Sequence, residues 1–167
     1  MGTVENLSSQ EAVDKIKHVA EHEIAMLCTF TTDGRIHPRP MGTQGVDADG
    51  TLWFMSKRNS TKNQQIDNHK KVQLIYSVSG KSEYLSLDGS AEILRDQRKI
   101  DELWNPFAKT WFTNGKEDPD ITLIRVIPRD GYYWDTKHGK MVSLAKIAVG
   151  AMTGKTMDDG VMGRLSP

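Results

Sequence analysis

The chain has 167 residues, enough for one domain with a hydrophobic core and too few for two domains of ordinary size. Its 22 lysines and arginines balance 22 aspartates and glutamates, so no net field attracts nucleic acid or an acidic membrane. No segment approaches the roughly 20 apolar residues of a membrane span, and the first residues lack an export signal. We expect one cytoplasmic domain over 1–167, with its core over about 8–155 and a loosely ordered tail after about 155.

An amphipathic helix is predicted at the start of the chain. Ser8-Ser9-Gln10-Glu11 has the form of a capping box, and apolar residues then recur at helical spacing to about His22. His18 and His22 are four residues apart, a spacing that can chelate a metal, but they share the polar face with charged residues. We therefore expect solvent-facing histidines and assign no metal site.

A meander of strands follows this helix. Residues 24–30, 35–46 and 51–56 are rich in apolar, branched and aromatic side chains and predict three strands. Pro38 and Pro40 lack the N–H that a central strand needs, so the second of these strands is expected to be an edge strand or a bulged strand. The predicted hairpin turns, rich in Gly, Asp and Ser, are at 31–34, 47–50 and 79–82.

The rest of the chain continues the pattern. We expect a short helix at 60–69, strands at 71–78, 83–94, 121–127 and 132–135, and helical segments at 95–104 and 107–112. A parallel doubly wound sheet would need a helix between successive strands, and the pattern lacks these helices. The predicted fold class is mainly β: a closed or partly closed barrel of about six to seven antiparallel strands with peripheral helices.

Several residues that could suggest chemistry have simpler predicted roles. Cys28, the single cysteine, lies in an apolar run and is expected to be a buried, unreactive thiol. Trp104, Trp111 and Phe112 are expected to pack the helical segment onto the barrel, although a ligand-binding role for them stays open.

Arg39 and the segment Ser60-Thr61-Lys62 form the candidate anion site. Two adjacent antiparallel strands can bring Arg39 and the end of the 51–56 strand to the same mouth of a barrel. A turn that enters a helix at 60–62 presents free N–H groups, two hydroxyls and an ammonium, which suit a phosphate. The same segment also fits a plainer structure, in which Ser60 caps a helix and Lys57, Arg58 and Lys62 form a solvated face.

Four motifs in fixed order resemble those of the pyridoxamine 5′-phosphate oxidase-like FMN-binding split-barrel family. They are Arg39-Pro40-Met41, Trp53-Phe54-Met55-Ser56, Ser60-Thr61-Lys62, and Ile124-Arg125-Val126-Ile127-Pro128 running into Tyr133-Trp134-Asp135. Ala151-Met-Thr-Gly-Lys155, after a helix expected from about Met141, is similar to the general stress protein branch of this family. The resemblance spans most of residues 8–155.

This resemblance implies a flavin, FMN in the first place with FAD left open, bound at the interface of a homodimer. Arg39 and Lys62 would bind the phosphate with help from Ser60 and Thr61, and Trp134 would reach the flavin from the second subunit. Tyr84 or Ser86 lies on the strand that would supply another contact between the subunits. Main-chain donors beside the ring would set its potential. The implied cofactor-binding residues are Arg39, Pro40, Met41, Gly42, Phe54, Met55, Ser56, Ser60, Thr61, Lys62 and Trp134.

The chain departs from the oxidase at the substrate positions. Gln44 stands where the oxidase has a substrate-binding lysine, and Lys140 and Val142 stand where it has an arginine and a histidine. A further cofactor-binding arginine is replaced by Leu144. Vitamin B6 oxidation is therefore not expected. The predicted function is a stress-related FMN-dependent oxidoreductase or flavin reductase, the alternative being a non-catalytic flavin sensor or store. Related split barrels also bind haem or the deazaflavin F420.

Overall fold

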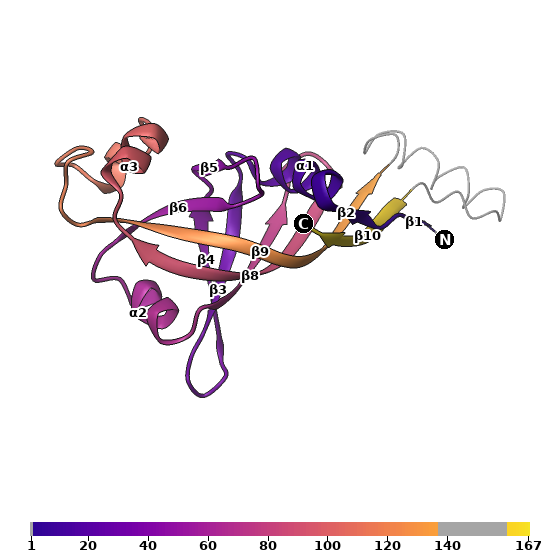
Figure 1. The fold of residues 1–167 in the computed structure, drawn as a ribbon, viewed down its shortest axis with the longest axis horizontal. Coiled ribbons are helices and arrows are strands. Elements are labelled where there is room, and N and C mark those ends of the chain that lie inside the picture. The colour runs from indigo at the N-terminus through magenta and orange to yellow at the C-terminus, as the bar shows by residue number, and fades with distance from the viewer. Residues whose placement is uncertain (1, 137–159) are drawn as a thin grey trace.

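A computed structural model describes residues 2–136 and 160–167 of the protein. Ten strands and four helices lie in this part of the chain (Figure 1). The strands are β1 (Thr3–Val4), β2 (Leu7–Ser8), β3 (Ile24–Phe30), β4 (Ile36–Gly42), β5 (Gly45–Val46), β6 (Leu52–Lys57), β7 (Lys71–Ser77), β8 (Tyr84–Leu94), β9 (Ile121–Thr136) and β10 (Gly160–Ser166). The helices are α1 (Ser9–Ala20), α2 (Thr61–Asn68), α3 (Gln97–Leu103) and α4 (Ala108–Trp111).

The sheet is a barrel with one split side. Its strand order is β1-β10-β9-β8-β7-β3-β4, and β6 joins it by pairing with β9 and with the short β5. Within the described residues β4 pairs with β3 alone, so β4 is an edge strand, as its two prolines predict. At one end the split is closed, because the Gln44 N–H donates to the Trp53 carbonyl at 2.8 Å. This is the split-barrel fold that the motifs predict.

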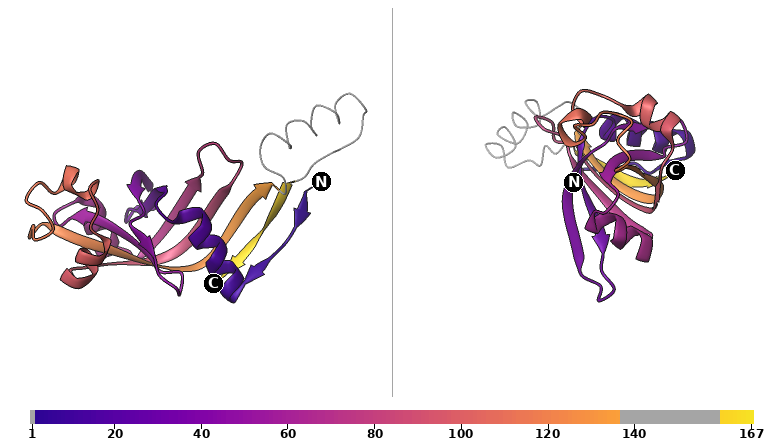
Figure 2. Two further views of the ribbon diagram at one scale, coloured as in Figure 1. Left: turned by 90° about the horizontal axis from the view of Figure 1, so that it is seen from above. Right: turned by 90° about the vertical axis from the view of Figure 1, so that its left-hand side faces the viewer.

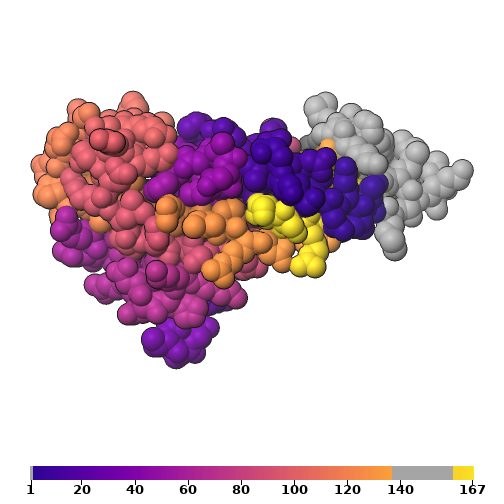
Figure 3. Space-filling model, in the orientation of Figure 1, coloured from indigo at the N-terminus to yellow at the C-terminus, as the bar shows by residue number. Residues whose placement is uncertain are grey.

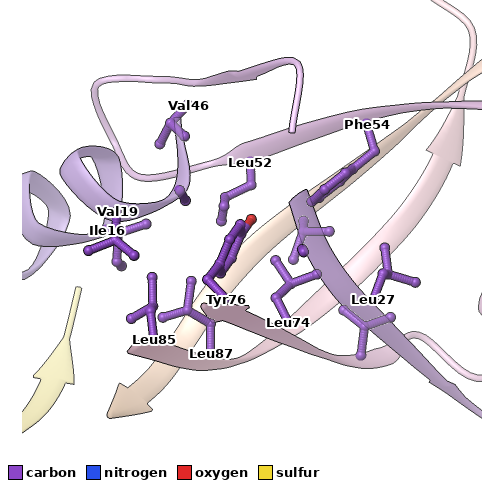
Figure 4. Close-up of a cluster of buried hydrophobic side chains, with 14 of the residues drawn as sticks. Ile16, Val19, Leu27, Val46, Leu52, Phe54, Leu74, Tyr76, Leu85 and Leu87 are labelled. Carbon is purple, nitrogen blue, oxygen red and sulfur yellow. The ribbon is translucent and has the colours of Figure 1, made fainter. Parts of the chain in front are cut away.

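The core lies inside the barrel and under α1. Alternate residues of the strands point inward, and the Tyr76 ring extends from β7 toward Leu52, with Ile16 of α1 on one side and Phe54 on the other (Figure 4). The Tyr76 hydroxyl and the Thr43 hydroxyl are 2.9 Å apart and share a hydrogen bond. Burial raises the pKa of the Tyr76 phenol well above its ordinary value.

The β8–β9 hairpin is longer than predicted. Residues 121–136 form one strand instead of two, and the register between the strands shifts at Asp88 and Gly89. A β-bulge bends a strand without ending it. The chain can therefore continue as one strand through residues 128–131, where the sequence predicts a break between two strands. Gly89 is required here, since a Cβ at this position would lie 2.9 Å from the Ile127 carbonyl oxygen.

The two ends of the chain differ from their predictions. No side-chain hydrogen bond caps α1 at Ser8, so the expected capping box does not form; Leu7 and Ser8 instead pair with β10. Gly160–Ser166 forms β10, an ordered strand in place of the expected loose tail, and Leu165 within it is fully buried. Figure 2 shows the N-terminal strands running beside β10 (yellow). Pairing between distant segments overrides the local pattern at both ends.

Helices α3 and α4 cover one end of the barrel, where they form the salmon region on the left of Figure 3. They enclose a second small core on the side of β6 and β9 away from the main one. Its buried members are Trp53, Ile100, Leu103, Phe112, Ile121 and Leu123. Phe112 packs as predicted and Trp104 packs partly, but Trp111 is 71 % exposed and does not. No helix among the described residues is long and apolar enough to cross a bilayer.

Candidate functional site

The Arg39 side chain lies on the inner side of β4, where the strand faces α2. Arg39 is in register with the buried Leu27 of β3. Its Nη2 donates to Thr29 Oγ1 at 2.9 Å, to the His37 carbonyl at 3.0 Å and to Gln65 Oε1 at 3.0 Å. Its Nη1 is buried and has no hydrogen-bond partner among the described residues. One end of the guanidinium is therefore held firmly and the other has donors to spare.

Lys62 lies on the first turn of α2, near Arg39. Burial lowers the pKa of the Lys62 ammonium, and the positive charge of Arg39 lowers it further. Burial also lowers the pKa of Arg39. Neither side chain has an acidic partner in the part of the chain that the structure describes. Two half-buried cations without a counter-ion form a local positive site in a chain of zero net charge.

The start of α2 adds donors to these cations. Ser60 is the N-cap, and its hydroxyl accepts from the Asn63 N–H at 3.4 Å. Thr61 is exposed, and the N–H groups of Thr61 and Lys62 make no hydrogen bond within the described residues. The start of α2 is thus a capped helix end, and two of its N–H groups stay free within the described residues.

A buried polar network fastens the start of α2 to the barrel. Asn63 Oδ1 accepts from Ser56 Oγ at 2.7 Å, and Asn63 Nδ2 donates to Thr122 Oγ1 at 2.9 Å. The same amide reaches the carbonyls of Lys57 and Arg58 at 3.2 and 3.3 Å. Ser56, a predicted flavin-site residue, therefore uses its side chain to hold the helix, which leaves only its main chain for a ligand.

The other predicted residues of β4 and β6 lie along the split. Phe54 is fully buried in the main core, Met41 packs against that core, and Met55 packs against the second core. Pro40 and Gly42 are exposed. The side chains of Phe54 and Met55 pack into the two cores, so these residues can offer mainly backbone groups at the β6 edge.

Trp134 is the one predicted site residue that the fold places elsewhere. It is 40 % exposed on the outer face of β9, where its ring lies tilted against that of Tyr132, and in the sheet register it pairs with Tyr84 of β8. Three strands separate β9 from β4, about 19 Å at the usual strand spacing, and Arg39 faces the opposite side of the sheet. A single chain does not bring Trp134 to the Arg39–Lys62 pair.

Gln44 is held by the protein itself. Its Oε1 accepts from Asn105 Nδ2 at 2.6 Å and its Nε2 donates to the Gly42 carbonyl at 2.9 Å. Asn105 Oδ1 in turn accepts the N–H groups of Phe107 and Ala108 at the start of α4. The remaining substrate and cofactor positions, Lys140, Val142 and Leu144, lie outside the described residues, as do the expected helix from Met141 and the segment 151–155.

The sequence reasoning missed Thr29, Gln65 and Asn63. Thr29 is a polar residue at an inward position of an apolar strand, which is a usable signal. Gln65 is three residues after Lys62 and thus shares its face of α2. No cluster of three or more potential metal ligands occurs in residues 2–136 and 160–167. Cys28 is buried, as expected, and burial raises the pKa of its thiol.

Comparison with known proteins agrees with this architecture. Residues 11–158 match the family "pyridoxamine 5′-phosphate oxidase like". General stress protein 26 of Bacillus subtilis is 26 % identical over 128 residues, 74 % of this chain and 89 % of that protein. A crystal structure of a general stress protein 26 from Jannaschia sp. CCS1 has a TM-score of 0.74 at 28 % identity, covering 93 % of this chain and 95 % of that one.

A second structural relative is a flavin-binding protein. The general stress FMN/FAD binding protein of Xanthomonas citri has a TM-score of 0.59 at 25 % identity, with coverage of 77 % of this chain and 85 % of that one. The family match extends over most of the chain, and the split barrel is the fold of these relatives. The chain therefore belongs to the pyridoxamine 5′-phosphate oxidase-like family, among relatives of general stress protein 26.

Proposed function

We propose that this protein is a homodimeric FMN-binding oxidoreductase without pyridoxamine phosphate oxidase activity. The observation that carries the proposal is the buried, unpartnered Nη1 of Arg39 beside the half-buried Lys62. Leaving such donors without a partner costs about 1–3 kcal/mol, and a phosphate would satisfy them. The FMN/FAD-binding relative from Xanthomonas citri supports the same ligand class.

Each part of the site has a role in holding a flavin mononucleotide. Arg39, Lys62 and the N–H groups at the start of α2 would bind the phosphate. The edges of β4 and β6 would orient the ring through main-chain groups, and the buried side chains behind them would keep water out. The flavin itself supplies reversible electron transfer when bound.

Gln44 supports a reaction other than vitamin B6 oxidation. The resemblance places it where the oxidase binds its substrate, and here it is tied to Asn105 and the Gly42 carbonyl. It also lacks the positive charge with which a lysine would hold a phosphorylated substrate. We expect no formation of pyridoxal 5′-phosphate from the pyridoxamine or pyridoxine phosphates.

The outer face of the sheet supports a homodimer. On this outer face, apolar side chains of four neighbouring strands are exposed side by side in the registers of β3, β7, β8 and β9. They are Ile24, Met26, Ile75, Tyr84 and Trp134. A second copy seated here would bury the patch and could bring its Trp134 toward the flavin of the first copy.

The first test is the visible absorption spectrum of the purified protein, followed by flavin titration. We expect a bound flavin, or micromolar binding of added FMN. Replacing Arg39 and Lys62 together by alanine should weaken FMN binding by roughly a hundredfold or more and leave riboflavin, which has no phosphate, nearly unchanged. The matched control removes two exposed cations beside the site, Lys57 and Arg58. Equal losses for both flavins would refute the phosphate site.

Turnover is tested separately. If NADH or NADPH bleaches the bound flavin and air restores its colour, the oxidoreductase proposal is supported. If only dithionite reduces the flavin, the protein is a flavin-binding module instead of an enzyme of this type.

A further inference from the structure

Gln65 forms hydrogen bonds with Arg39 and with two residues beside it, Thr29 and His37. Its Oε1 accepts from the Thr29 hydroxyl at 2.6 Å and from Arg39 Nη2 at 3.0 Å. On the other side, its Nε2 lies 3.2 Å from Nδ1 of His37. One amide on α2 therefore connects β3 and β4 at the mouth of the split.

The donors around this amide fix its orientation. A guanidinium has donors and no acceptor, so the oxygen of Gln65 must face Arg39. The Thr29 hydroxyl gives its hydrogen to the same oxygen and can then accept from Arg39 Nη2 at 2.9 Å. With the His37 carbonyl, three acceptors surround Nη2. Because a guanidinium is planar and rigid, holding Nη2 also sets the direction of Nη1.

We infer that Gln65, with Thr29, is a positioning residue that aims Nη1 of Arg39 at the cofactor phosphate. The inference rests on the proposed function. Gln65 touches the phosphate ligand Arg39 and comes from the same turn of α2 as the second ligand, Lys62. The Gln65 amide thus fixes the position of the Arg39 guanidinium relative to Lys62.

The neutral charge of Gln65 is part of this role. A glutamate at position 65 could accept the same hydrogen bonds, but it would form an ion pair with Arg39 and cancel one of the two positive charges. A phosphate monoester carries nearly two negative charges at neutral pH and needs both cations. An amide holds the guanidinium and leaves its charge available.

The experiment compares FMN with riboflavin, with binding followed by flavin fluorescence. For Gln65→Leu and Gln65→Glu we expect FMN affinity to fall about tenfold while riboflavin affinity is unchanged. The glutamate variant should also show a weaker dependence of FMN affinity on salt, because one cation is neutralised. Gln64→Leu, on the exposed neighbour, is the matched control and should change neither affinity.

A second pair of variants keeps the test valid if Gln65→Leu folds poorly. Thr29→Val removes the hydroxyl at nearly constant volume and should lose the preference for FMN over riboflavin. Thr29→Ser keeps the hydroxyl and should keep this preference. Equal loss of FMN and riboflavin in the Gln65 variants, or no loss of either, would overturn the inference while the Arg39–Lys62 result still stands. A wild-type protein that binds both flavins equally would instead refute the proposed function, and the inference with it.

Discussion

At Lys62 the fold keeps a positive charge beside that of Arg39 and partly out of water. Both burial and the neighbouring charge lower the pKa of this ammonium. The unfolded chain therefore holds the proton more firmly than the folded chain does, so charging Lys62 opposes folding. Such an arrangement is typical of ligand sites, where the bound group supplies the missing charge.

Replacing Lys62 by methionine tests whether burial and repulsion from Arg39 make the Lys62 charge unfavourable to folding. Without flavin, Lys62→Met should be slightly more stable than the wild type at pH 7, by less than about 1 kcal/mol because the site is partly solvated. The difference should vanish as the pH rises from the lowered pKa toward about 10.4, the ordinary lysine value, since the wild-type side chain then loses its charge. Urea unfolding at several pH values measures both effects.

Two comparisons complete this prediction. Lys57→Met, which removes an exposed cation near the same helix, should show no such gain. Saturating FMN should reverse the order of stability, because the wild type binds the phosphate more tightly. A Lys62→Met variant less stable than the wild type at pH 7 without flavin would contradict the prediction.

Among the elements, α2 carries most of the site. Ser60 caps the helix, Lys62 and Gln65 face Arg39, and Asn63 faces inward to Ser56 and Thr122. The helix is only two turns long, too short to be stable by itself. Its position at the mouth of the split therefore depends on the tertiary contacts of Asn63 and the buried Ile66.

Replacing Asn63 by alanine should lower the free energy of unfolding by about 2–4 kcal/mol. The substitution removes several buried hydrogen bonds at once and leaves the hydroxyls of Ser56 and Thr122 without that partner. FMN affinity should fall as well, since the start of α2 is released. Urea unfolding followed by circular dichroism measures the first effect. Gln64→Ala, one residue along the helix and exposed, should cost less than about 0.5 kcal/mol; equal costs would argue against the network.

At the scale of the whole molecule, the barrel has its cation pair and its exposed tryptophan on opposite faces. Arg39 faces the inside of the sheet beside α2, and Trp134 lies on the outer face, with three strands between β4 and β9. The hydrogen bonds of the intervening strands hold the two residues apart within one chain. A complete flavin site of the kind we propose therefore needs a second copy of the chain.

A charge at the centre of the outer face should dissociate the proposed dimer. Ile75 lies between Met26 and Ser86 in the sheet register. Ile75→Lys should produce a monomer by analytical ultracentrifugation and weaken FMN binding about tenfold or more, because an unpaired charge is costly in an apolar interface. Phe107→Lys is the control, since Phe107 is 83 % exposed beside α4. If that variant dissociates the dimer and Ile75→Lys does not, the interface lies at the helical end instead.

The sequence predicted most elements because their signals are local. Turn glycines with positive φ, at Gly34, Gly50 and Gly80, lie in the hairpins where the turn residues placed them. The prolines put β4 at an edge, and Ser60 begins α2. Each of these features is decided by the conformations that a few neighbouring residues can adopt.

By itself, then, the sequence determined the family, the meander of strands and the presence of two cations at one mouth of a barrel. Only the tertiary structure decided that β10 is a strand and that Gln65 and Thr29 hold Arg39. It also placed Trp134 on the opposite face from Arg39. The physical reason is range: turns and periodicity depend on adjacent residues, whereas these features join segments far apart in the chain, whose pairing only the packed barrel specifies.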